Sequence, residues 1–294
     1  MTTIGFIGLG HMGKAMSRHL LKAGNSLVVY DISPQAVQAL TQEGATAADS
    51  LASLAEQCSV IFTSVQTGQQ VADICLSHDG IFSHATRDLL YIDCSSIDVS
   101  TTQALHAEAE KLRITMLDAP VSGGVAGAEA ASLTIMVGGS DTAFQRAQPL
   151  LKNLGKNIIH AGPAGHGQAV KICNNLLLGI SMIGVAEAFT LAAKLGLDQK
   201  KFFDISSHAS GQCWSMTSYC PVPGILPNVP ANHDYQPGFT AAMMLKDLRL
   251  GQHAAEAVNA SIPLGAVATE LYELYVNQGC GETDFSGIIR LLAI

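Results

Sequence analysis

An ammonium and two amides lie close together in the stretch GHGQAVKICNN, residues 165–175, just before a strongly apolar run. Lys171, Asn174 and Asn175 are three and four residues apart, so they share one face of a helix. A helix that is apolar nearly all round is buried, and burial lowers the pKa of an unpaired lysine. Such a lysine can exchange a proton near neutral pH. The pattern predicts Lys171 as a general acid or base and the asparagines as donors to a substrate oxygen. Three exposed residues in the first helical turns are the alternative.

The N-terminus carries a glycine pattern that is typical of dinucleotide binding. Gly8, Gly10 and Gly13 form G-x-G-x-x-G between an expected strand and an expected helix, where such glycines permit a tight turn and close approach of a diphosphate. The second expected strand, SLVVYD, ends at Asp31. A carboxylate there can bind the ribose diol and repels a 2′-phosphate, so we expect NAD rather than NADP. The alternative is that Asp31 caps a helix beginning at Pro34.

Two further stretches carry candidate site residues. The sequence DAPVSGG ends in Ser122, Gly123 and Gly124, whose hydroxyl and successive N–H groups can bind a carboxylate, although a plain turn explains them equally well. Lys246 and Asp247 lie in a mostly apolar helical stretch. By themselves they favour an exposed ion pair, with Arg249 or with a partner elsewhere.

Short β-branched runs alternate with helical stretches over the first half of the chain, which predicts a doubly wound parallel sheet of the Rossmann type. The pattern is helical after Gly162. We therefore expect a nucleotide-binding domain over residues 1–163 and an all-helical domain over 164–294, with a long interdomain helix from about Gln168 to Lys194. The loop over 211–238 holds five of the ten prolines and the only tryptophan, and we expect it to be ordered and packed.

The composition narrows the class of protein. The chain has 294 residues, 14% of them charged, and a formal net charge of −8, so nucleic acid and an anionic membrane are not expected partners. Seven dispersed cysteines without CxxC spacing favour reduced thiols in the cytoplasm, and the ten histidines show no metal-ligand spacing. The opening MTTIGFIG leads straight into an expected strand, so we expect no signal peptide.

Taken together, these stretches identify the chain as similar to the β-hydroxyacid dehydrogenases, most closely their 3-hydroxyisobutyrate branch. Four blocks carry the resemblance, which covers nearly the whole chain. They are GFIGLGHMG (5–13), DAPVSGG (118–124), GHGQAVKICNN (165–175) and KDLRLGQ (246–252). The proline-rich loop with its CWS and PVPG runs resembles the same branch. The chain departs from the family pattern at Ser64–Gln66, at Ser96 and Val99, and at Ala131, where glycine is common.

The resemblance implies roles for individual residues. Lys171 corresponds to the catalytic lysine. The implied substrate-binding residues are Ser122, Gly123, Gly124, Asn174, Asn175, Lys246 and Asp247. The implied cofactor-binding residues are Gly8, Leu9, Gly10, His11, Met12, Gly13, Asp31, Val65, Gln66, Gln70, Ser96 and Lys246.

The function expected from residues and resemblance together is NAD-dependent oxidation of 3-hydroxyisobutyrate to methylmalonate semialdehyde, as in valine breakdown. No metal is expected, and the family resemblance implies a homodimer or homotetramer. Two alternatives stay open. One is an NAD(P)H-dependent reductase of tartronate or succinic semialdehyde, and the other is a non-catalytic dinucleotide-binding sensor.

Overall fold

The computed structural model describes residues 3–85 and 88–292. The chain forms two compact units, Met1–Lys171 and Ile172–Ile294, which we call the N-terminal unit and the C-terminal unit. The boundary expected between residues 163 and 164 coincides with the end of the last strand. The N-terminal unit extends further, because the first turn of the following helix binds through its backbone N–H groups to Asp118.

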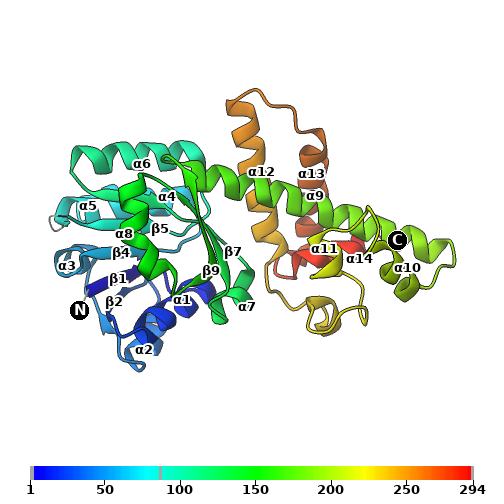
Figure 1. The fold of residues 1–294 in the computed structure, drawn as a ribbon, viewed down its shortest axis with the longest axis horizontal. Coiled ribbons are helices and arrows are strands. Elements are labelled where there is room, and N and C mark those ends of the chain that lie inside the picture. Colours follow the sequence, from blue (N-terminus) through cyan, green and yellow to red (C-terminus); the bar gives the residue numbers. More distant parts are fainter. Residues whose placement is uncertain (1–2, 86–87, 293–294) are drawn as a thin grey trace. The chain divides into compact units, whose positions relative to one another are not determined.

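The N-terminal unit contains a nine-stranded sheet in the order β3-β2-β1-β4-β5-β6-β8-β7, with β9 paired to β8 (Figure 1). The strands are β1 (Thr3–Ile7), β2 (Ser26–Tyr30), β3 (Thr46–Ala47), β4 (Val60–Thr63), β5 (Leu90–Asp93), β6 (Thr115–Asp118), β7 (Val121–Ser122), β8 (Leu133–Gly138) and β9 (Gly155–Gly162). The predicted parallel, Rossmann-like arrangement is confirmed for β1 to β6. The far edge differs from the prediction, since β8 runs antiparallel to β6 and β7. After β6 the chain turns back through β7 and one short helix, so β8 enters the sheet in the opposite direction.

Helices cover both faces of this sheet. The helices are α1 (His11–Lys22), α2 (Pro34–Thr41), α3 (Leu51–Gln57), α4 (Gly68–Leu76), α5 (Ile81–His84), α6 (Val99–Lys111), α7 (Gly124–Glu129) and α8 (Asp141–Leu151). Successive strand residues point to opposite faces of a sheet. Phe62 accordingly packs in the core under α1, α2, α7 and α8, whereas Ile61 packs in the core under α3 to α6. This alternation explains the apolar runs of the central strands, which are buried on both faces.

The C-terminal unit is helical, as expected. It comprises most of α9 (His166–Lys194), then α10 (Gln199–Ser206), α11 (Trp214–Thr217), α12 (Ala241–Ala257), α13 (Pro263–Tyr275) and α14 (Ile289–Leu292), with 3₁₀ turns at Pro230–His233 and Phe285–Ile288 and a π-helical turn at Val276–Cys280. Its core joins α9, α12 and α13 through side chains such as Met182, Met244 and Tyr272. Among the described residues, α9 is the one helix long and apolar enough to cross a membrane, by length and composition alone. A helix in the core of a soluble protein can have the same composition. Met182 and Phe189 of α9 are buried in two hydrophobic clusters of the C-terminal unit.

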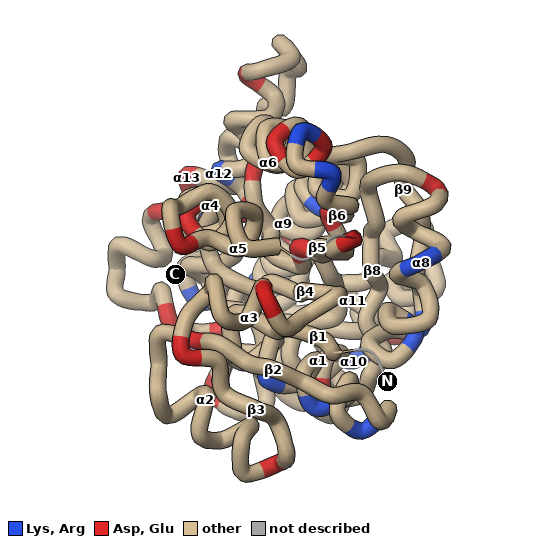
Figure 2. The backbone as a smooth tube through the Cα atoms, turned by 90° about the vertical axis from the view of Figure 1, so that its left-hand side faces the viewer, with Lys and Arg blue, Asp and Glu red and all other residues tan. Residues whose placement is uncertain are grey.

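The proline-rich loop over 211–238 is ordered, as its aromatic content predicts. Trp214 stacks on Tyr219 with ring centroids 5.0 Å apart, and Tyr219 stacks on Phe285 at 5.4 Å. The Tyr219 hydroxyl donates to the buried Asp284 carboxylate at 2.9 Å, and burial raises the pKa of that phenol. Charged residues are dispersed along the chain, and the view in Figure 2 shows Lys and Arg in short, separated segments.

Candidate active site

The glycine turn after β1 is closely packed where the fingerprint requires it. Gly8 has a φ of +88°, and a Cβ placed there would lie 2.3 Å from the carbonyl oxygen of Ser64. A Cβ at Gly13 would lie 1.9 Å from the carbonyl oxygen of Gly8, so α1 lies against the strand only because residue 13 has no side chain. These contacts explain two of the three glycines by packing alone.

Gly10 stands apart from this packing. A Cβ at Gly10 would meet no atom within 4 Å, and α1 begins there without a side-chain cap on its first N–H groups. The first N–H groups of a helix have no intrahelical partner and attract anions. The turn therefore has both the space and the donors that the diphosphate of NAD requires.

The Asp31 carboxylate binds the same turn. Its Oδ2 atom accepts from the backbone N–H of Leu9 at 2.6 Å, and its Oδ1 atom accepts from the N–H of Ser33 at 2.7 Å. Ser33, and not Asp31, caps α2 through its hydroxyl, which accepts from Ala36 N. The alternative in which Asp31 caps that helix is therefore wrong. Asp31 lies beside the glycine turn, where its contact with a ribose remains a prediction.

The loops after β4 and β5 lie at the carboxyl edge of the sheet, where ligands bind in folds of this type. Val65 N donates to the hydroxyl of Ser95 at 3.0 Å, so the two loops are joined. Burial raises the pKa of Asp93, at the end of β5, while hydrogen bonds from Ser95 and Thr63 act in the opposite direction. Ser96 follows and is half-buried.

Gln66 and Gln70 have a different arrangement. The Gln70 side-chain oxygen accepts from the N–H groups of Gln66 and Thr67, while Thr67 caps α4. This capping box accounts for Gln70 without a ligand. Gln66 itself is exposed. The predicted contacts of both residues with the cofactor stay predictions.

The turn at Ser122–Gly124 contains two glycines in backbone conformations that favour glycine. Gly123 and Gly124 have φ values of +136° and +63°, and α7 begins without a side-chain cap. Ser122 is half-buried. Helix α7 ends in a Schellman motif, in which Ser132 N binds Gly127 O and Ala131 takes the left-handed position with a φ of +49°. The left-handed position explains why glycine suits residue 131.

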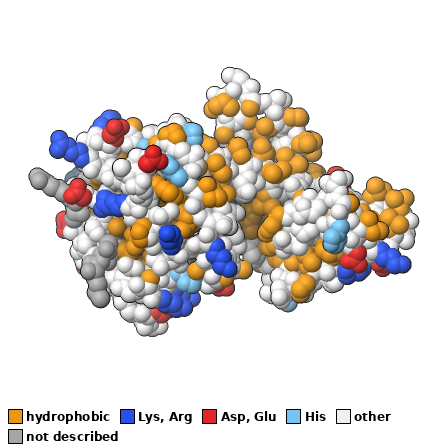
Figure 3. Space-filling model, in the orientation of Figure 1, with side chains coloured by type: hydrophobic (Ala, Val, Ile, Leu, Met, Phe, Trp, Pro, Cys, Tyr) orange, Lys and Arg blue, Asp and Glu red, His pale blue; other side chains and the backbone are white. Residues whose placement is uncertain are grey.

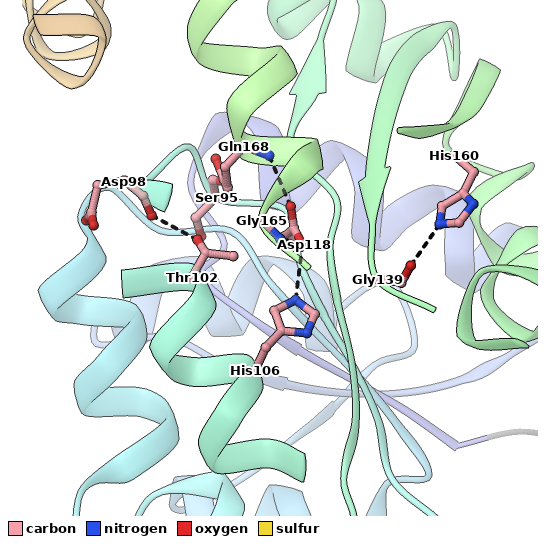
Figure 4. Close-up of polar contacts among 9 residues, drawn as sticks. All are labelled: Ser95, Asp98, Thr102, His106, Asp118, Gly139, His160, Gly165 and Gln168. Carbon is pink, nitrogen blue, oxygen red and sulfur yellow. Dashed lines mark hydrogen bonds and ion pairs between the residues drawn. The ribbon is translucent and has the colours of Figure 1, made fainter. Parts of the chain in front are cut away.

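Lys171 lies in α9 and is buried, with 8% of its surface exposed. The helix start is held at the sheet edge by the fully buried Asp118 and Gln168, which Figure 4 shows with most of their partners. Asn175, four residues further along, is 2% exposed, and Asn174 is half-buried. The exposed alternative is therefore wrong for Lys171 and Asn175.

In the C-terminal unit, two hydrogen bonds and one ion pair connect four predicted site residues. Asn174 Nδ2 donates to Asn175 Oδ1 at 3.0 Å, and Asn175 Nδ2 donates to Asp247 Oδ2. The other carboxylate oxygen of Asp247 pairs with the Lys246 ammonium at 2.9 Å. Asp247 is 4% exposed, so the pair is not the exposed pair expected from sequence alone. Arg249 pairs instead with Glu273 at 3.0 Å.

Sequence reasoning missed three residues of this region, namely His106, Asp118 and Gln168. Asp118 and Gln168 lie inside blocks that carry the family resemblance, but neither spacing nor composition indicates that they meet. No group of three or more His, Cys, Asp or Glu side chains over residues 3–85 and 88–292 is placed to hold a metal ion.

Comparison with known proteins gives the family. Residues 3–162 match the family model described as the NAD-binding domain of 6-phosphogluconate dehydrogenase, and residues 165–292 match the NAD-binding region of NADP-dependent 3-hydroxyisobutyrate dehydrogenase. An NAD-dependent L-serine dehydrogenase of Pseudomonas aeruginosa is 44% identical over 99% of this chain and 98% of its own. A 3-hydroxyisobutyrate dehydrogenase of the same organism is also 44% identical, over the same shares.

A solved structure agrees with these relatives. The structure of Mycobacterium tuberculosis 3-hydroxyisobutyrate dehydrogenase with L-serine matches with a TM-score of 0.95 and 41% identity, over the full length of both chains. The chain therefore belongs to the 3-hydroxyisobutyrate dehydrogenase family, and it is an NAD-binding hydroxyacid dehydrogenase.

Proposed function

We propose that this chain oxidises 3-hydroxyisobutyrate to methylmalonate semialdehyde with NAD, and that Lys171 is its general acid and base. The observation that carries the proposal is a buried lysine side chain on α9, one helical turn before the buried amide of Asn175. A lysine that touches little water is suited to proton transfer. The proposal extends the family assignment to one substrate and one catalytic residue.

The mechanism assigns each group one task. The glycine turn at Gly8–Gly13 would hold NAD, whose nicotinamide would supply the acceptor for the hydride that leaves the carbon bearing the substrate hydroxyl. The neutral Lys171 amine takes the hydroxyl proton as that C–H bond breaks, and in the reverse direction the ammonium returns the proton to the developing alkoxide. The N–H groups and hydroxyl at Ser122–Gly124 bind the substrate carboxylate. Asn175 orients the hydroxyl oxygen.

Within the C-terminal unit, the contacts of Asp247 and Lys246 support the proposed role of Asn175 in orienting the substrate. Asn175 gives one N–H to Asp247 and accepts one bond from Asn174, so its amide has a defined orientation with one further N–H to offer. Lys246 pairs with Asp247 and keeps 31% of its side chain exposed, which leaves surface for a contact with substrate or cofactor.

L-Serine is the second candidate substrate. A relative named as an L-serine dehydrogenase is as similar to this chain as the 3-hydroxyisobutyrate enzyme, and the matching solved structure was determined with L-serine. Both compounds carry a carboxylate and a 3-hydroxyl group, so the same lysine and turn would serve either. They differ at carbon 2, where serine has an ammonium and 3-hydroxyisobutyrate a methyl group.

The test is NADH formation by the purified protein with NAD and each enantiomer of 3-hydroxyisobutyrate, with L-serine, glycerate and 3-hydroxypropionate alongside. We expect one 3-hydroxyisobutyrate enantiomer to have the highest kcat/KM. A higher kcat/KM for L-serine would replace the substrate and keep the mechanism. Activity only with NADPH and tartronate or succinic semialdehyde would favour the reductase alternative.

The role of Lys171 is tested separately. Lys171→Ala should lower kcat by at least about 10²-fold, the low end of general acid–base contributions, and leave NADH binding intact. Lys194→Ala, an exposed lysine at the other end of α9, is the matched control and should retain full activity. Turnover by Lys171→Ala at the wild-type rate would contradict the assignment.

We also propose that the protein is a homodimer or homotetramer of the cytoplasm. Large apolar side chains are exposed on one helix of the C-terminal unit, with Leu264 at 66%, Val267 at 52% and Leu274 at 48% on α13. Figure 3 shows hydrophobic side chains gathered on the surface of this unit. Such patches mark association surfaces. Sedimentation of the wild type against Leu264→Lys tests the proposal, and a wild-type monomer would contradict it.

A further inference from the structure

We propose that Asp118 and Gln168 are positioning residues, which hold Lys171 in place relative to the cofactor-side loop after β5. The inference rests on the proposed role of Lys171 and adds two residues to which no contact with substrate is assigned. All the residues concerned belong to the N-terminal unit, and Figure 4 shows most of their contacts.

The Asp118 carboxylate binds the start of α9. It is fully buried, and its Oδ1 atom accepts from Gly165 N at 2.8 Å and pairs with His106 Nε2 at 3.0 Å. Its Oδ2 atom accepts from Gln168 N at 3.0 Å. The first N–H groups of a helix lack intrahelical partners, and a negative charge beside them is favourable. Asp118 therefore attaches the first turn of α9 to the end of strand β6.

Two glycines make this attachment possible. A Cβ at Gly138 would lie 2.6 Å from both Asp118 carboxylate oxygens, and a Cβ at Gly167 would lie 2.4 Å from the carbonyl oxygen of Met136 and 2.6 Å from that of Asp118. Any side chain at either position would push α9 away from β6 and β8. The close approach of α9 to β6 and β8 therefore depends on these two glycines as well as on the hydrogen bonds of Asp118.

The Gln168 side chain joins the same helix to the loop after β5. It is fully buried, and its Oε1 atom accepts from Ile97 N at 3.1 Å while its Nε2 atom donates to Ser95 O at 2.7 Å. These two partners flank Ser96, a predicted cofactor residue. Lys171 follows Gln168 by three residues, so the two lie on neighbouring turns of one helical face. One amide therefore links the helix that carries the lysine to the loop that carries Ser96.

This arrangement has a kinetic consequence. Proton transfer from the hydroxyl to Lys171 has to accompany hydride transfer, so the lysine and the cofactor loop need a fixed separation. A misplacement of about 1 Å in such a site can lower the rate by about 10²-fold. Breaking the Gln168 link should therefore lower the rate of the chemical step in molecules that are folded and bind NADH.

The experiment uses Gln168→Met, which keeps the volume of the side chain and removes the amide, and Asp118→Asn, which replaces one acceptor oxygen with a donor. Leu151→Ala is the matched control, because it removes buried apolar contacts of α8 in the same unit and leaves the sequence of α9 unchanged. For each variant, active sites are counted by NADH titration, and kcat per site and the pH profile of kcat/KM are measured.

We expect both site variants to lose about tenfold or more in kcat per NADH-binding site, within the range that misplacement allows. The pKa seen in the pH profile of kcat/KM should also shift. Leu151→Ala should lower the melting temperature and change neither quantity. Wild-type kcat per site and an unchanged pH profile in Gln168→Met would overturn the inference, whether or not Asp118→Asn folds.

The result is distinguishable from failure of the proposed function. An active Lys171→Ala variant would refute the assignment of Lys171 as the catalytic lysine. An inactive Lys171→Ala variant together with a fully active Gln168→Met variant would keep the lysine and reject only its positioning by Gln168.

Discussion

Replacing Asp31 with alanine separates two roles of one carboxylate. In the structure the carboxylate accepts two backbone N–H bonds, from Leu9 at 2.6 Å and from Ser33 at 2.7 Å. Hydrogen bonds to charged groups contribute about 1.5–3 kcal/mol each when buried, and Asp31 is only half-buried, so we expect a loss of about 1–3 kcal/mol in unfolding free energy. Without these two bonds the glycine turn is less rigid, which weakens the binding of NAD and of NADP to the same extent.

The effect on cofactor preference has a different origin. A carboxylate bound to the ribose diol contributes to NAD binding only, and the same charge repels the 2′-phosphate of NADP. Loss of one charge-assisted bond of about 1.5–3 kcal/mol corresponds to about 10- to 10²-fold in kcat/KM for NAD. The effect of the loosened turn cancels in the ratio of the two kcat/KM values, so the preference for NAD over NADP should narrow by about tenfold or more.

The assay is the kcat/KM for each cofactor, with the melting temperature of each variant. Ser33→Ala is the matched control, since it removes the α2 cap in the same segment and leaves the carboxylate in place. The control should destabilise by about 0.5–2 kcal/mol and keep the cofactor ratio. If Asp31→Ala lowers both kcat/KM values in parallel, the carboxylate serves the turn only and the ribose contact is refuted.

Three further predictions concern residue 13, residue 131 and two buried cysteines. Gly13→Ala should weaken NADH binding and lower the unfolding free energy by about 1–3 kcal/mol, because the new Cβ would lie 1.9 Å from Gly8 O; NADH titration and thermal melting measure both, and wild-type affinity would contradict the packing argument. Ala131→Gly should stabilise by up to about 1 kcal/mol, because residue 131 has a φ of +49° that is costly for alanine, and an unchanged or lower melting temperature would refute this. Burial raises the pKa of the Cys58 thiol to about 12 and that of Cys220 to about 11, so both should resist alkylation in the native protein; mass spectrometry after iodoacetamide treatment detects any modification before unfolding.

The features that sequence alone determined are local along the chain. The glycine turn, the Asp31 position at a strand end and the shared face of Lys171 and Asn175 follow from spacings of a few residues within one turn or helix. The sequence predicts β1, β2, β4, β5 and β6 correctly, because each of these strands has buried apolar residues on both faces. It does not indicate β3, whose two residues, Thr46 and Ala47, are exposed. The sequence did not indicate that Ser33 caps α2, because Asp31 and Ser33 both have side chains that could cap a helix beginning at Pro34.

Only the tertiary structure decided the contacts between distant segments. Asp118 meets Gln168 across 50 residues and Asn175 meets Asp247 across 72, and no periodicity records which strand end or helix face will meet which. The antiparallel entry of β8 likewise depends on how the chain turns back after β6. Local spacing determines which side chains share a face, whereas the approach of backbones at Gly138 and Gly167 determines which of those faces touch, since it depends on atoms that are close in space and far apart in sequence.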